Sequence, residues 1–377
     1  WATQYGMQKA DGVELYSQDG TDYQLITQSG VSAGQSVVYV PSDIVLNSYT
    51  IEQEFGASLQ QAESALIQID TQSNVPQGAE YRLPLFRLMV KILSEYEKGP
   101  EVSIYYPWLN SLPRQFFNGV SMTNACFKCL PPYAGWLAQN ERITCSHFTA
   151  ALREGYIPLL AETITNKEVT KWAYNVALTR FHEVWQPERA KVIGPMADML
   201  NHASEPNCQI TVDYEGNMNV EALYDIPAGS PLTISLGDPT NPTPIFAQYG
   251  FLPQDCATIF CKAKHLDPQI MELGYDYKEL LIQTETGEIA PKVWDIFLYD
   301  ILQNSDPGAA QQFLMACRNG DEGSKEQYQS EYFAYTLDAM KNHFYSIMND
   351  VENLTYKAQS YDINKHPRVP VIAAHNE

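Results

Sequence analysis

The alternation of two kinds of sequence pattern most constrains the fold of this chain. Residues 1–50 and 190–252 carry short apolar runs broken by turn residues, as short strands do. In the first stretch the run Ser36–Val40 ends at a proline, and in the second, residues 209–223 predict a β-hairpin that turns at Glu215-Gly216-Asn217. Between and after these stretches the pattern is helical. We therefore expect a mostly β unit, interrupted by a helical insert and followed by a helical tail.

Helical periodicity fills residues 58–97, where apolar residues recur three and four positions apart. Shorter helical segments are expected around 144–154 and 167–180. The pattern turns helical again from about residue 260, and the clearest helix covers 331–352. One apolar stripe runs along that last helix: Phe333, Leu337, Met340, Phe344, Ile347 and Val351. Rules of layer packing allow this arrangement but predict no function from it.

The acidity of the chain disfavours one class of partner. The 377 residues carry a formal net charge of −21, which disfavours a phosphate backbone, so we expect no direct nucleic-acid partner. The acidity serves solubility alone, or it attracts a basic, lysine-containing protein segment, and both interpretations stay open. Neither a signal peptide nor an apolar run of about 18 residues occurs, which predicts no membrane span. The chain opens at Trp1 instead of Met, so we expect it to be trimmed, and a targeting segment can be missing.

The cysteines predict neither a disulfide framework nor a metal site. They are odd in number and scattered along the chain, at positions 126, 129, 145, 208, 256, 261 and 317. Cys126 and Cys129 form a lone CxxC pair, whereas a zinc site needs two further ligands at a suitable spacing. We expect ordinary reduced thiols and no metal.

The segments with the most chemical information lie between residues 195 and 251. Pro195–His202 ends in an Asn-His pair, Asp225–Gly237 contains the run Ile-Pro-Ala-Gly, and Tyr249-Gly250-Phe251 follows. Alone, an Asn-His pair could cap a turn, and a Tyr-Gly-Phe could belong to a core. In this order and spacing the segments resemble the two halves of a SET-domain active site. The first half is the family's "ADxxNH" segment, and the second is its "IPAGxxLxISYG…N…YGF" segment.

The resemblance extends over about residues 1–253 and points to the Rubisco large-subunit methyltransferase branch of SET-domain protein methyltransferases, which also includes an actin-histidine methyltransferase. Tyr23–Thr27 and Ala33–Pro41 follow the family's opening hairpins. Tyr106–Leu109 resembles part of the branch's helical insert, and Thr179-Arg180-Phe181 matches its arginine segment. For the remaining residues, the resemblance rests on a helical tail of suitable length.

The resemblance implies an α+β fold, namely a SET-domain β-fold with pseudoknot-like threading, a helical insert and an all-α C-terminal domain. The chain is long enough for two domains with cores of their own. We expect a SET domain over 1–257, with the insert over about 58–180, and a helical substrate-binding domain over 258–377. The molecule is expected to be an intracellular monomer, and the sequence does not distinguish nucleus, cytoplasm and plastid.

The implied reaction is methyl transfer from S-adenosylmethionine to a protein lysine, of a histone or another protein. Such a site must align a neutral amine with the methyl group and exclude water. The resemblance implies that Arg180 pairs with the cofactor carboxylate, that Asp198 supports this end, and that Tyr249 is catalytic. The full set of implied cofactor-binding residues is Tyr23, Gln24, Leu25, Arg180, Asp198, Asn201, His202, Tyr249 and Phe251. Without the resemblance, Arg180 could form a surface ion pair and Asp198 could cap a turn.

Two positions depart from the family pattern. The second active-site segment usually carries a tyrosine that is regarded as catalytic, and this chain has Leu236 there. A leucine cannot hydrogen-bond an amine. Three explanations are open: another tyrosine, such as Tyr249, Tyr214 or Tyr224, takes the role; transfer proceeds by positioning alone; or catalysis is lost and binding kept. The glycine-rich cofactor loop of the family is also replaced, by residues 22–25.

Two alternatives to lysine methylation therefore stay open. One is methylation of a histidine ring, because nothing in the chain separates the two acceptors. The other is a catalytically weak or inactive SET module that binds a peptide or a partner protein.

Overall fold

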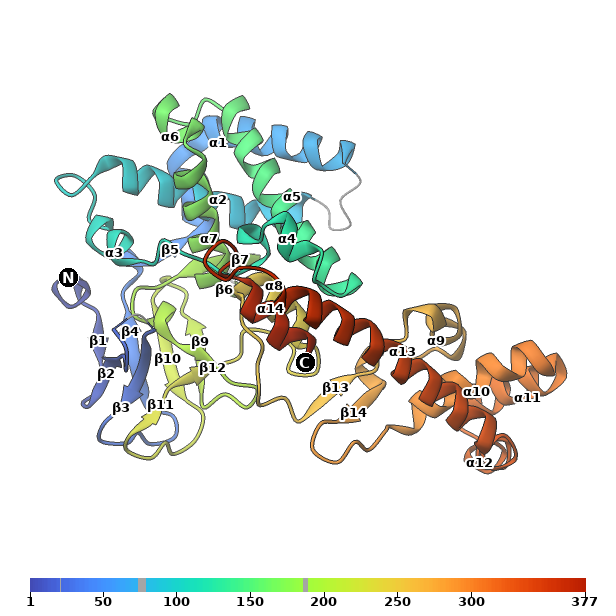
Figure 1. Ribbon diagram of the computed structural model, residues 1–377. Coiled ribbons are helices and arrows are strands. Elements are labelled where there is room, and N and C mark those ends of the chain that lie inside the picture. Colours follow the sequence, from blue (N-terminus) through green and yellow to red (C-terminus); the bar gives the residue numbers. More distant parts are fainter. Residues whose placement is uncertain (21, 74–78, 186–188) are drawn as a thin grey trace. The chain divides into compact units, whose positions relative to one another are not determined.

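A computed structural model describes residues 1–20, 22–73, 79–185 and 189–377 (Figure 1). The chain forms two compact units, each built from several stretches of sequence. Unit 1 comprises Trp1–Met122, Trp136–Leu236 and Ala247–Phe251, and unit 2 comprises Thr123–Gly135, Gly237–Phe246 and Leu252–Glu377. The expected division into domains 1–257 and 258–377 stays a prediction.

The strands of unit 1 form several small sheets. A four-stranded sheet has the order β1-β4-β10-β9, and smaller sheets have the orders β11-β3-β2, β5-β7-β6 and β12-β8. The bounds are β1 Gln8–Lys9, β2 Val13–Tyr16, β3 Gln24–Thr27, β4 Ser36–Val40, β5 Leu46–Asn47, β6 His182–Trp185, β7 Arg189–Ile193, β8 Asn201–His202, β9 Cys208–Val212, β10 Met218–Ala222, β11 Ser230–Pro231 and β12 Thr233–Ile234. The hairpin expected around the Glu-Gly-Asn turn is confirmed, because β9 and β10 pair antiparallel.

Alternating burial explains why β10 belongs to a sheet with one face on the core. Met218, Val220 and Ala222 are buried, while the two residues between them are partly exposed. Gly216, in the turn before this strand, has a φ of 86°, which a glycine adopts without strain. These local preferences account for the antiparallel pairing of β9 with β10, whereas the pairing of β10 with β4 joins residues about 180 positions apart.

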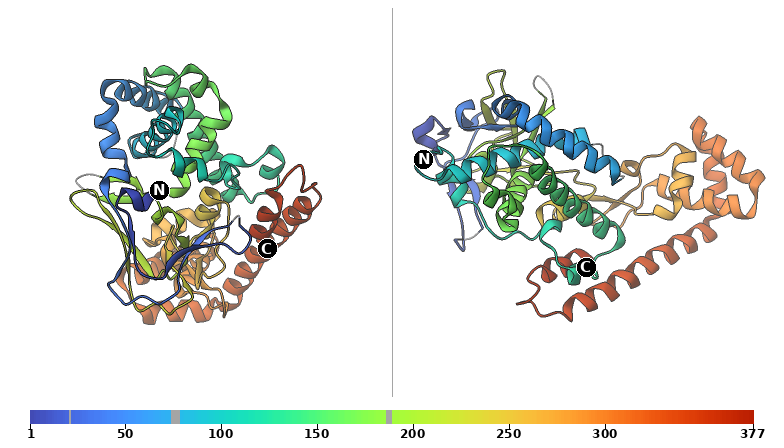
Figure 2. Two further views of the ribbon diagram at one scale, coloured as in Figure 1. Left: turned by 90° about the vertical axis from the view of Figure 1, so that its left-hand side faces the viewer. Right: turned by 90° about the horizontal axis from the view of Figure 1, so that it is seen from above.

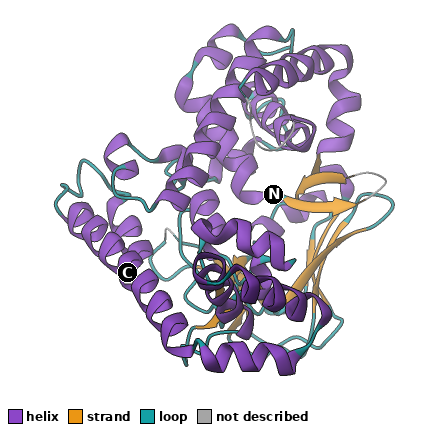
Figure 3. Cartoon of the chain, turned by 90° about the vertical axis from the view of Figure 1, so that its right-hand side faces the viewer, coloured by secondary structure: helices purple, strands orange, loops and turns teal. Residues whose placement is uncertain are grey.

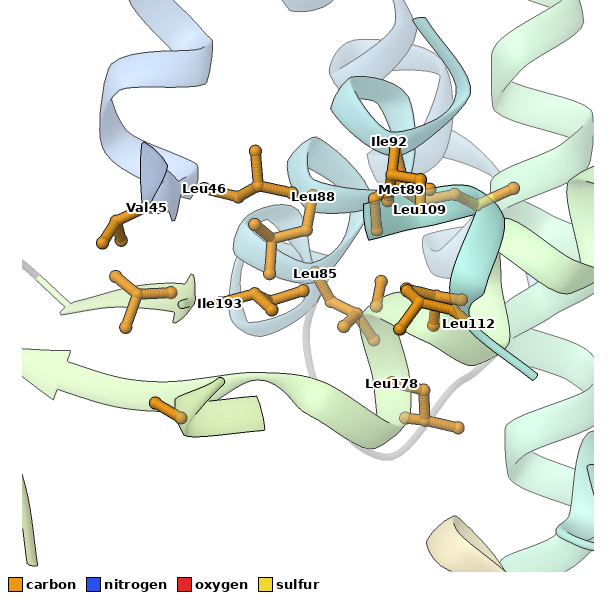
Figure 4. Packing of buried hydrophobic residues seen from close by; sticks show 14 of the residues in the cluster. Val45, Leu46, Leu85, Leu88, Met89, Ile92, Leu109, Leu112, Leu178 and Ile193 are labelled. Atoms are coloured by element: carbon orange, nitrogen blue, oxygen red, sulfur yellow. The ribbon is translucent and has the colours of Figure 1, made fainter. Parts of the chain in front are cut away.

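Among the helices of unit 1, α1 and α2 pack on each other and against the strands β5 and β7. The bounds of the helices are α1 Ser48–Gln72, α2 Ala79–Lys98, α3 Tyr106–Ser111, α5 Pro132–Glu154, α6 Ala161–Thr165 and α7 Lys167–Arg180, and the first residues of α5 belong to unit 2. Figure 2 shows these helices in blue to green from two further directions. Figure 4 shows how the labelled side chains meet: Val45, Leu46, Leu85, Leu88, Met89, Ile92, Leu109, Leu112, Leu178 and Ile193. All of them are buried, so the insert shares one core with the sheets.

The expected helices differ from the observed ones mainly at their beginnings. The region 58–97 corresponds to α1 and α2, and residues 74–78 lie outside the described part of the chain. Helix α1 begins ten residues earlier, at Ser48, where the Asn47 side chain accepts from the Tyr49 amide. Its early part is hard to predict because Gly56 has a non-helical φ of 53° and kinks the helix. Helix α7 has the expected bounds, and the Asn166 side chain caps its first turn.

Unit 2 is mainly helical, and its helices surround a second hydrophobic core. The bounds are α4 Asn124–Phe127, α8 Pro242–Tyr249, α9 Asp267–Leu273, α10 Pro291–Ser305, α11 Pro307–Asn319, α12 Glu322–Glu331, α13 Phe333–Gln359 and α14 Val369–Asn376. The last residues of α8 belong to unit 1. Phe313, Leu298 and Ile296 are fully buried at the centre of the core. The long helix α13 extends beyond the expected 331–352, and only the middle of its apolar stripe, at Met340, is fully buried.

An all-α tail is not what the structure shows. The strands β13 Thr258–Phe260 and β14 Leu281–Gln283 pair antiparallel, and Figure 3 distinguishes strands from helices by colour. They are three residues long and twenty residues apart, so no local pattern revealed them. Short 3-10 turns complete the fold: Ala2–Tyr5, Ser42–Ile44, Gly119–Ser121, Ala197–Met199, Lys264–Leu266 and Tyr277–Glu279. Within the described residues, no helix has the length and apolar character needed to cross a bilayer.

Candidate functional site

The two halves of the expected site meet through a short parallel pairing. Strand β8 lies beside β12, with Asn201 opposite Thr233 and His202 opposite Ile234. The amide of Leu236 donates to Nδ1 of His202 at 3.1 Å. Because Nδ1 accepts this hydrogen bond, the ring proton of the neutral imidazole sits on Nε2. The Asn-His pair is therefore fixed to the second segment by backbone groups, whatever side chain stands at residue 236.

Two aromatic residues, one at the end of α8 and one just after it, extend this arrangement. The ring centroid of Phe251 lies 6.1 Å from that of His202 and 6.2 Å from that of Tyr249. Gly250, between them, has a φ of 86°, and its Cα approaches the backbone of Phe117 and Asn118 so closely that a Cβ would lie 2.6 Å from the Phe117 carbonyl carbon. A glycine is needed at this point for both reasons.

A buried ion pair lies at the end of α7. Arg180, its last residue, donates from Nη1 to the Asp198 Oδ2 at 2.9 Å and to the Asp198 carbonyl at 3.1 Å. The indole Nε1 of Trp108 donates to the same Oδ2 at 3.2 Å. The Asp198 side chain is 0% exposed and that of Arg180 is 12% exposed, so the surface ion pair considered for Arg180 is wrong. Burial raises the pKa of Asp198, and the Arg180 charge opposes that rise.

One donor of this pair is left over. Nε of Arg180 is buried and has no hydrogen-bond partner among the described residues. A buried guanidinium N–H without an acceptor is unfavourable, so an acceptor from outside the chain suits this position. The turn that leads into Asp198 is itself strained, because Met196 has a φ of 72°, which a residue other than glycine rarely adopts.

The expected cofactor loop at the start of β3 is joined to the site only in part. Leu25 is fully buried, and its carbonyl accepts from the Leu232 amide at 2.8 Å, next to β12. Tyr23 is exposed and Gln24 is half-buried. Among the described residues, no hydrogen bond or ring contact joins Tyr23 or Gln24 to the Arg180–Asp198 pair. Their assignment to a cofactor site stays a prediction.

A cavity of about 530 Å³ opens beside the second segment, wholly within unit 1. Its lining includes Phe181, His182, Cys208, Leu236, Gln248 and Tyr249. Burial and the Glu141 carboxylate raise the pKa of Tyr249, so its hydroxyl keeps its proton at neutral pH. The Gln248 amide donates to the Leu178 carbonyl at 2.9 Å and fixes the wall next to Tyr249. This volume lies within the range of about 300–1,000 Å³ that is typical of ligand-binding cavities.

Two residues of the site carried no sequence signal for their position. Trp108 stood in a motif without a role, and here it hydrogen-bonds Asp198 while stacking on Trp1 at a centroid distance of 6.5 Å. His182, the first residue of β6, lines the cavity. Tyr214 and Tyr224, which the sequence offered as substitutes for the missing tyrosine, are exposed and do not line it.

The described residues contain no group of three or more His, Cys, Asp or Glu side chains that could hold a metal ion. All seven cysteines are free thiols, and six of them are buried.

Comparisons with known proteins agree on one family. The family model of the SET domain matches residues 23–237. A solved structure described as the SET domain of LSMT bound to lysine and AdoHcy is similar over 99% of this chain and 85% of its own, at 12% identity and a TM-score of 0.58. A second, Rubisco LSMT bound to sinefungin and monomethyllysine, has the same coverage, identity and TM-score.

A third similar structure, Rubisco LSMT bound to AdoMet, covers 100% of this chain and 87% of its own, at 12% identity and a TM-score of 0.53. At this identity the likeness concerns the fold. No curated protein matches the sequence.

Proposed function

Because this chain belongs to the SET-domain family, we propose that it transfers a methyl group from S-adenosylmethionine to a lysine side chain of a protein. The observation that carries the proposal is the buried Arg180–Asp198 pair with its unpaired Nε, next to the β8–β12 pairing. The similar LSMT structures are described as bound to AdoMet, AdoHcy and lysine, which supports the same choice of cofactor and acceptor.

The residues of the first half fit the amino-acid end of such a cofactor. Arg180 has a free buried donor for a carboxylate, and Asp198, held in turn by Trp108, fixes the guanidinium plane. His202 has its ring orientation set by the Leu236 amide and its face next to Phe251. When bound, S-adenosylmethionine supplies an electrophilic methyl group on a sulfonium.

The cavity fits the acceptor. A lysine amine must lose its proton before it can attack, and a site that is poor in water favours the neutral amine. The Tyr249 hydroxyl stays protonated and can either donate to or accept from that amine. Leu236 contributes an apolar wall and no hydrogen bond. The chain then acts by holding the amine in line with the methyl group.

The first experiment tests the cofactor and the transfer separately. Calorimetry with S-adenosylmethionine should show binding to one site, and incubation with radiolabelled cofactor and a lysine-rich protein mixture should label lysine. Binding without transfer to lysine or histidine in any protein would contradict an enzyme and support the alternative that Leu236 favours, a SET module that binds without catalysis. Absence of cofactor binding would contradict the proposal as a whole.

A second experiment tests the assigned pocket. Arg180→Ala and Asn201→Ala should each weaken cofactor binding by about tenfold or more, because a charge-assisted hydrogen bond contributes roughly 1.5–3 kcal/mol. Arg153→Ala, an exposed arginine at the end of α5, is the matched control and should bind as the unaltered chain does. Normal binding by Asn201→Ala would show that the pocket is assigned wrongly. The monomeric state and the lack of a nucleic-acid partner stay predictions.

A further inference from the structure

We propose that His182 is the hydrogen-bonding group that receives the acceptor amine in the cavity, a role that Leu236 cannot fill. The inference rests on the proposed function, since it names a residue that contacts the acceptor in the same site. His182 follows Arg180 by two residues, so one short stretch at the junction of α7 and β6 supplies both. The same cavity is lined by Leu236 and Tyr249.

The hydrogen-bonding state of the His182 ring supports this role. Its Nε2 is buried and has no hydrogen-bond partner among the described residues. Elsewhere in unit 1 a half-buried histidine is satisfied, because Nδ1 of His147 lies 2.5 Å from Oδ1 of Asp70. A buried polar atom without a partner is unfavourable, and such atoms persist where a ligand supplies the partner.

The electrostatics suit an amine better than an ion. Burial lowers the pKa of His182 to about 4, so the ring is neutral at physiological pH. A protonated ring here would repel both a lysine ammonium and a sulfonium. A neutral imidazole instead offers one bare nitrogen, which accepts an N–H of a neutral amine. Because Nε2 is buried while the His182 residue lines the cavity, this role requires a rotation about the soft Cβ–Cγ torsion that turns Nε2 toward the cavity.

Two polar groups in this cavity match the two N–H groups of a primary amine. One N–H donates to the bare nitrogen of His182 and the other to the Tyr249 hydroxyl oxygen, so that the lone pair of the amine is left free for attack. No proton is moved onto His182 in this arrangement. His182 contributes by orienting the amine. A single hydrogen bond to Tyr249 would leave the amine free to rotate, and the second hydrogen bond fixes the direction of its lone pair.

The test measures acceptor binding apart from transfer. Free L-lysine is titrated by calorimetry onto the full chain saturated with S-adenosylhomocysteine. His182→Phe keeps an aromatic ring and removes both nitrogens, and His182→Gln keeps a polar group that donates and accepts. The matched control is His375→Phe in unit 2, where burial likewise lowers the pKa of the histidine to about 4 but the ring packs on Phe246.

We expect His182→Phe to raise the Kd for lysine about tenfold with the cofactor Kd unchanged, and His182→Gln to recover part of the loss. His375→Phe should leave both constants unchanged. An unchanged lysine Kd in His182→Phe, with circular dichroism showing a folded chain, overturns the inference, as does an unaltered protein that binds the cofactor but no lysine. Failure of the proposed function looks different: lysine binding depends on His182, yet S-adenosylmethionine donates no methyl group.

Discussion

At the scale of single residues, the backbone and the side chain of Leu236 have separate roles. Its backbone amide holds His202, and its half-buried side chain faces the cavity. A change of side chain therefore need not disturb the β8–β12 pairing. The absence of a tyrosine hydroxyl at residue 236 changes the lining of the cavity, while the backbone hydrogen bond from residue 236 to His202 is kept.

Leu236→Tyr should consequently raise the rate of methyl transfer by about tenfold or more, because a hydroxyl near the amine can orient it and exchange a proton with it. Leu236→Phe is the matched control, since it adds the ring without the hydroxyl. Single-turnover rates with saturating cofactor compare the three proteins. Equal rates for the tyrosine and phenylalanine variants would show that the hydroxyl is not what the site lacks.

Lys191 gives a prediction about stability and pH. The residue is buried, its Nζ lies 3.4 Å from the Phe181 ring centroid, and burial lowers its pKa from 10.5 to about 8. The unfolded chain therefore binds a proton between about pH 8 and pH 10.5 that the folded chain does not. The folded state is penalised by a constant amount below pH 8, and the penalty disappears as the pH rises through this window.

Lys191→Met should raise the free energy of unfolding at pH 7 by about 1–3 kcal/mol, since the shift in pKa corresponds to about 3 kcal/mol and a cation–π contact offsets part of it. The gain should shrink as the pH rises from about 8 to 10.5. Chemical unfolding at several pH values measures it. Lys167→Met, at an exposed lysine, is the control, and a gain of equal size at all pH values would contradict the explanation.

At the scale of elements, the end of α8 depends on one close approach. Gly250→Ala should lower the free energy of unfolding of the chain by about 1 kcal/mol for the positive φ and by a further 1–3 kcal/mol for the clash with the Phe117 backbone. Gly229→Ala is the matched control, because Gly229 has a φ of 83° and a Cβ there would meet nothing within 4 Å. The difference between their urea midpoints isolates the clash, and equal midpoints would contradict it.

Elements whose signals are local were predicted from the sequence. Helix α7 has the expected bounds because Asn166 caps it and Phe181 turns extended after Arg180. The β9–β10 hairpin follows from alternation around one turn. The pairing of β13 with β14 and the kink at Gly56 depend on contacts or backbone angles that no local pattern encodes.

The site shows the same limit. The motif segments predict Asn201, His202 and Phe251 as site residues, and in the structure the ring centroids of the last two lie 6.1 Å apart. The unpaired atoms of Arg180 and His182 could not be predicted, because an unsatisfied hydrogen bond is a property of the packed molecule and leaves no trace in residue order.

At the scale of the whole molecule, the net charge of −21 predicts how the proposed substrate arrives. The KM for a lysine-rich peptide should rise about tenfold between roughly 50 and 500 mM salt with kcat unchanged, because screening weakens the attraction and leaves the bound geometry intact. Initial rates over a salt series measure this. A peptide of zero net charge with one lysine is the control. If the KM of both peptides depends on salt equally, the negative charge of the protein does not attract the substrate and serves solubility alone.

The interleaving of the two units has a consequence for biosynthesis. Segment Thr123–Gly135 belongs to unit 2, where the Asn376 amide donates to the Cys129 carbonyl at 2.9 Å and the Thr123 hydroxyl lies 3.3 Å from Nδ1 of His366. During synthesis this segment is complete some 230 residues before His366 and Asn376 are added, so Thr123 and the Cys129 carbonyl lack these hydrogen-bond partners until the end of the chain is made. A fragment that stops near residue 257 would lack these partners permanently. We therefore expect such a fragment, and the nascent chain before it is complete, to depend on chaperones for solubility.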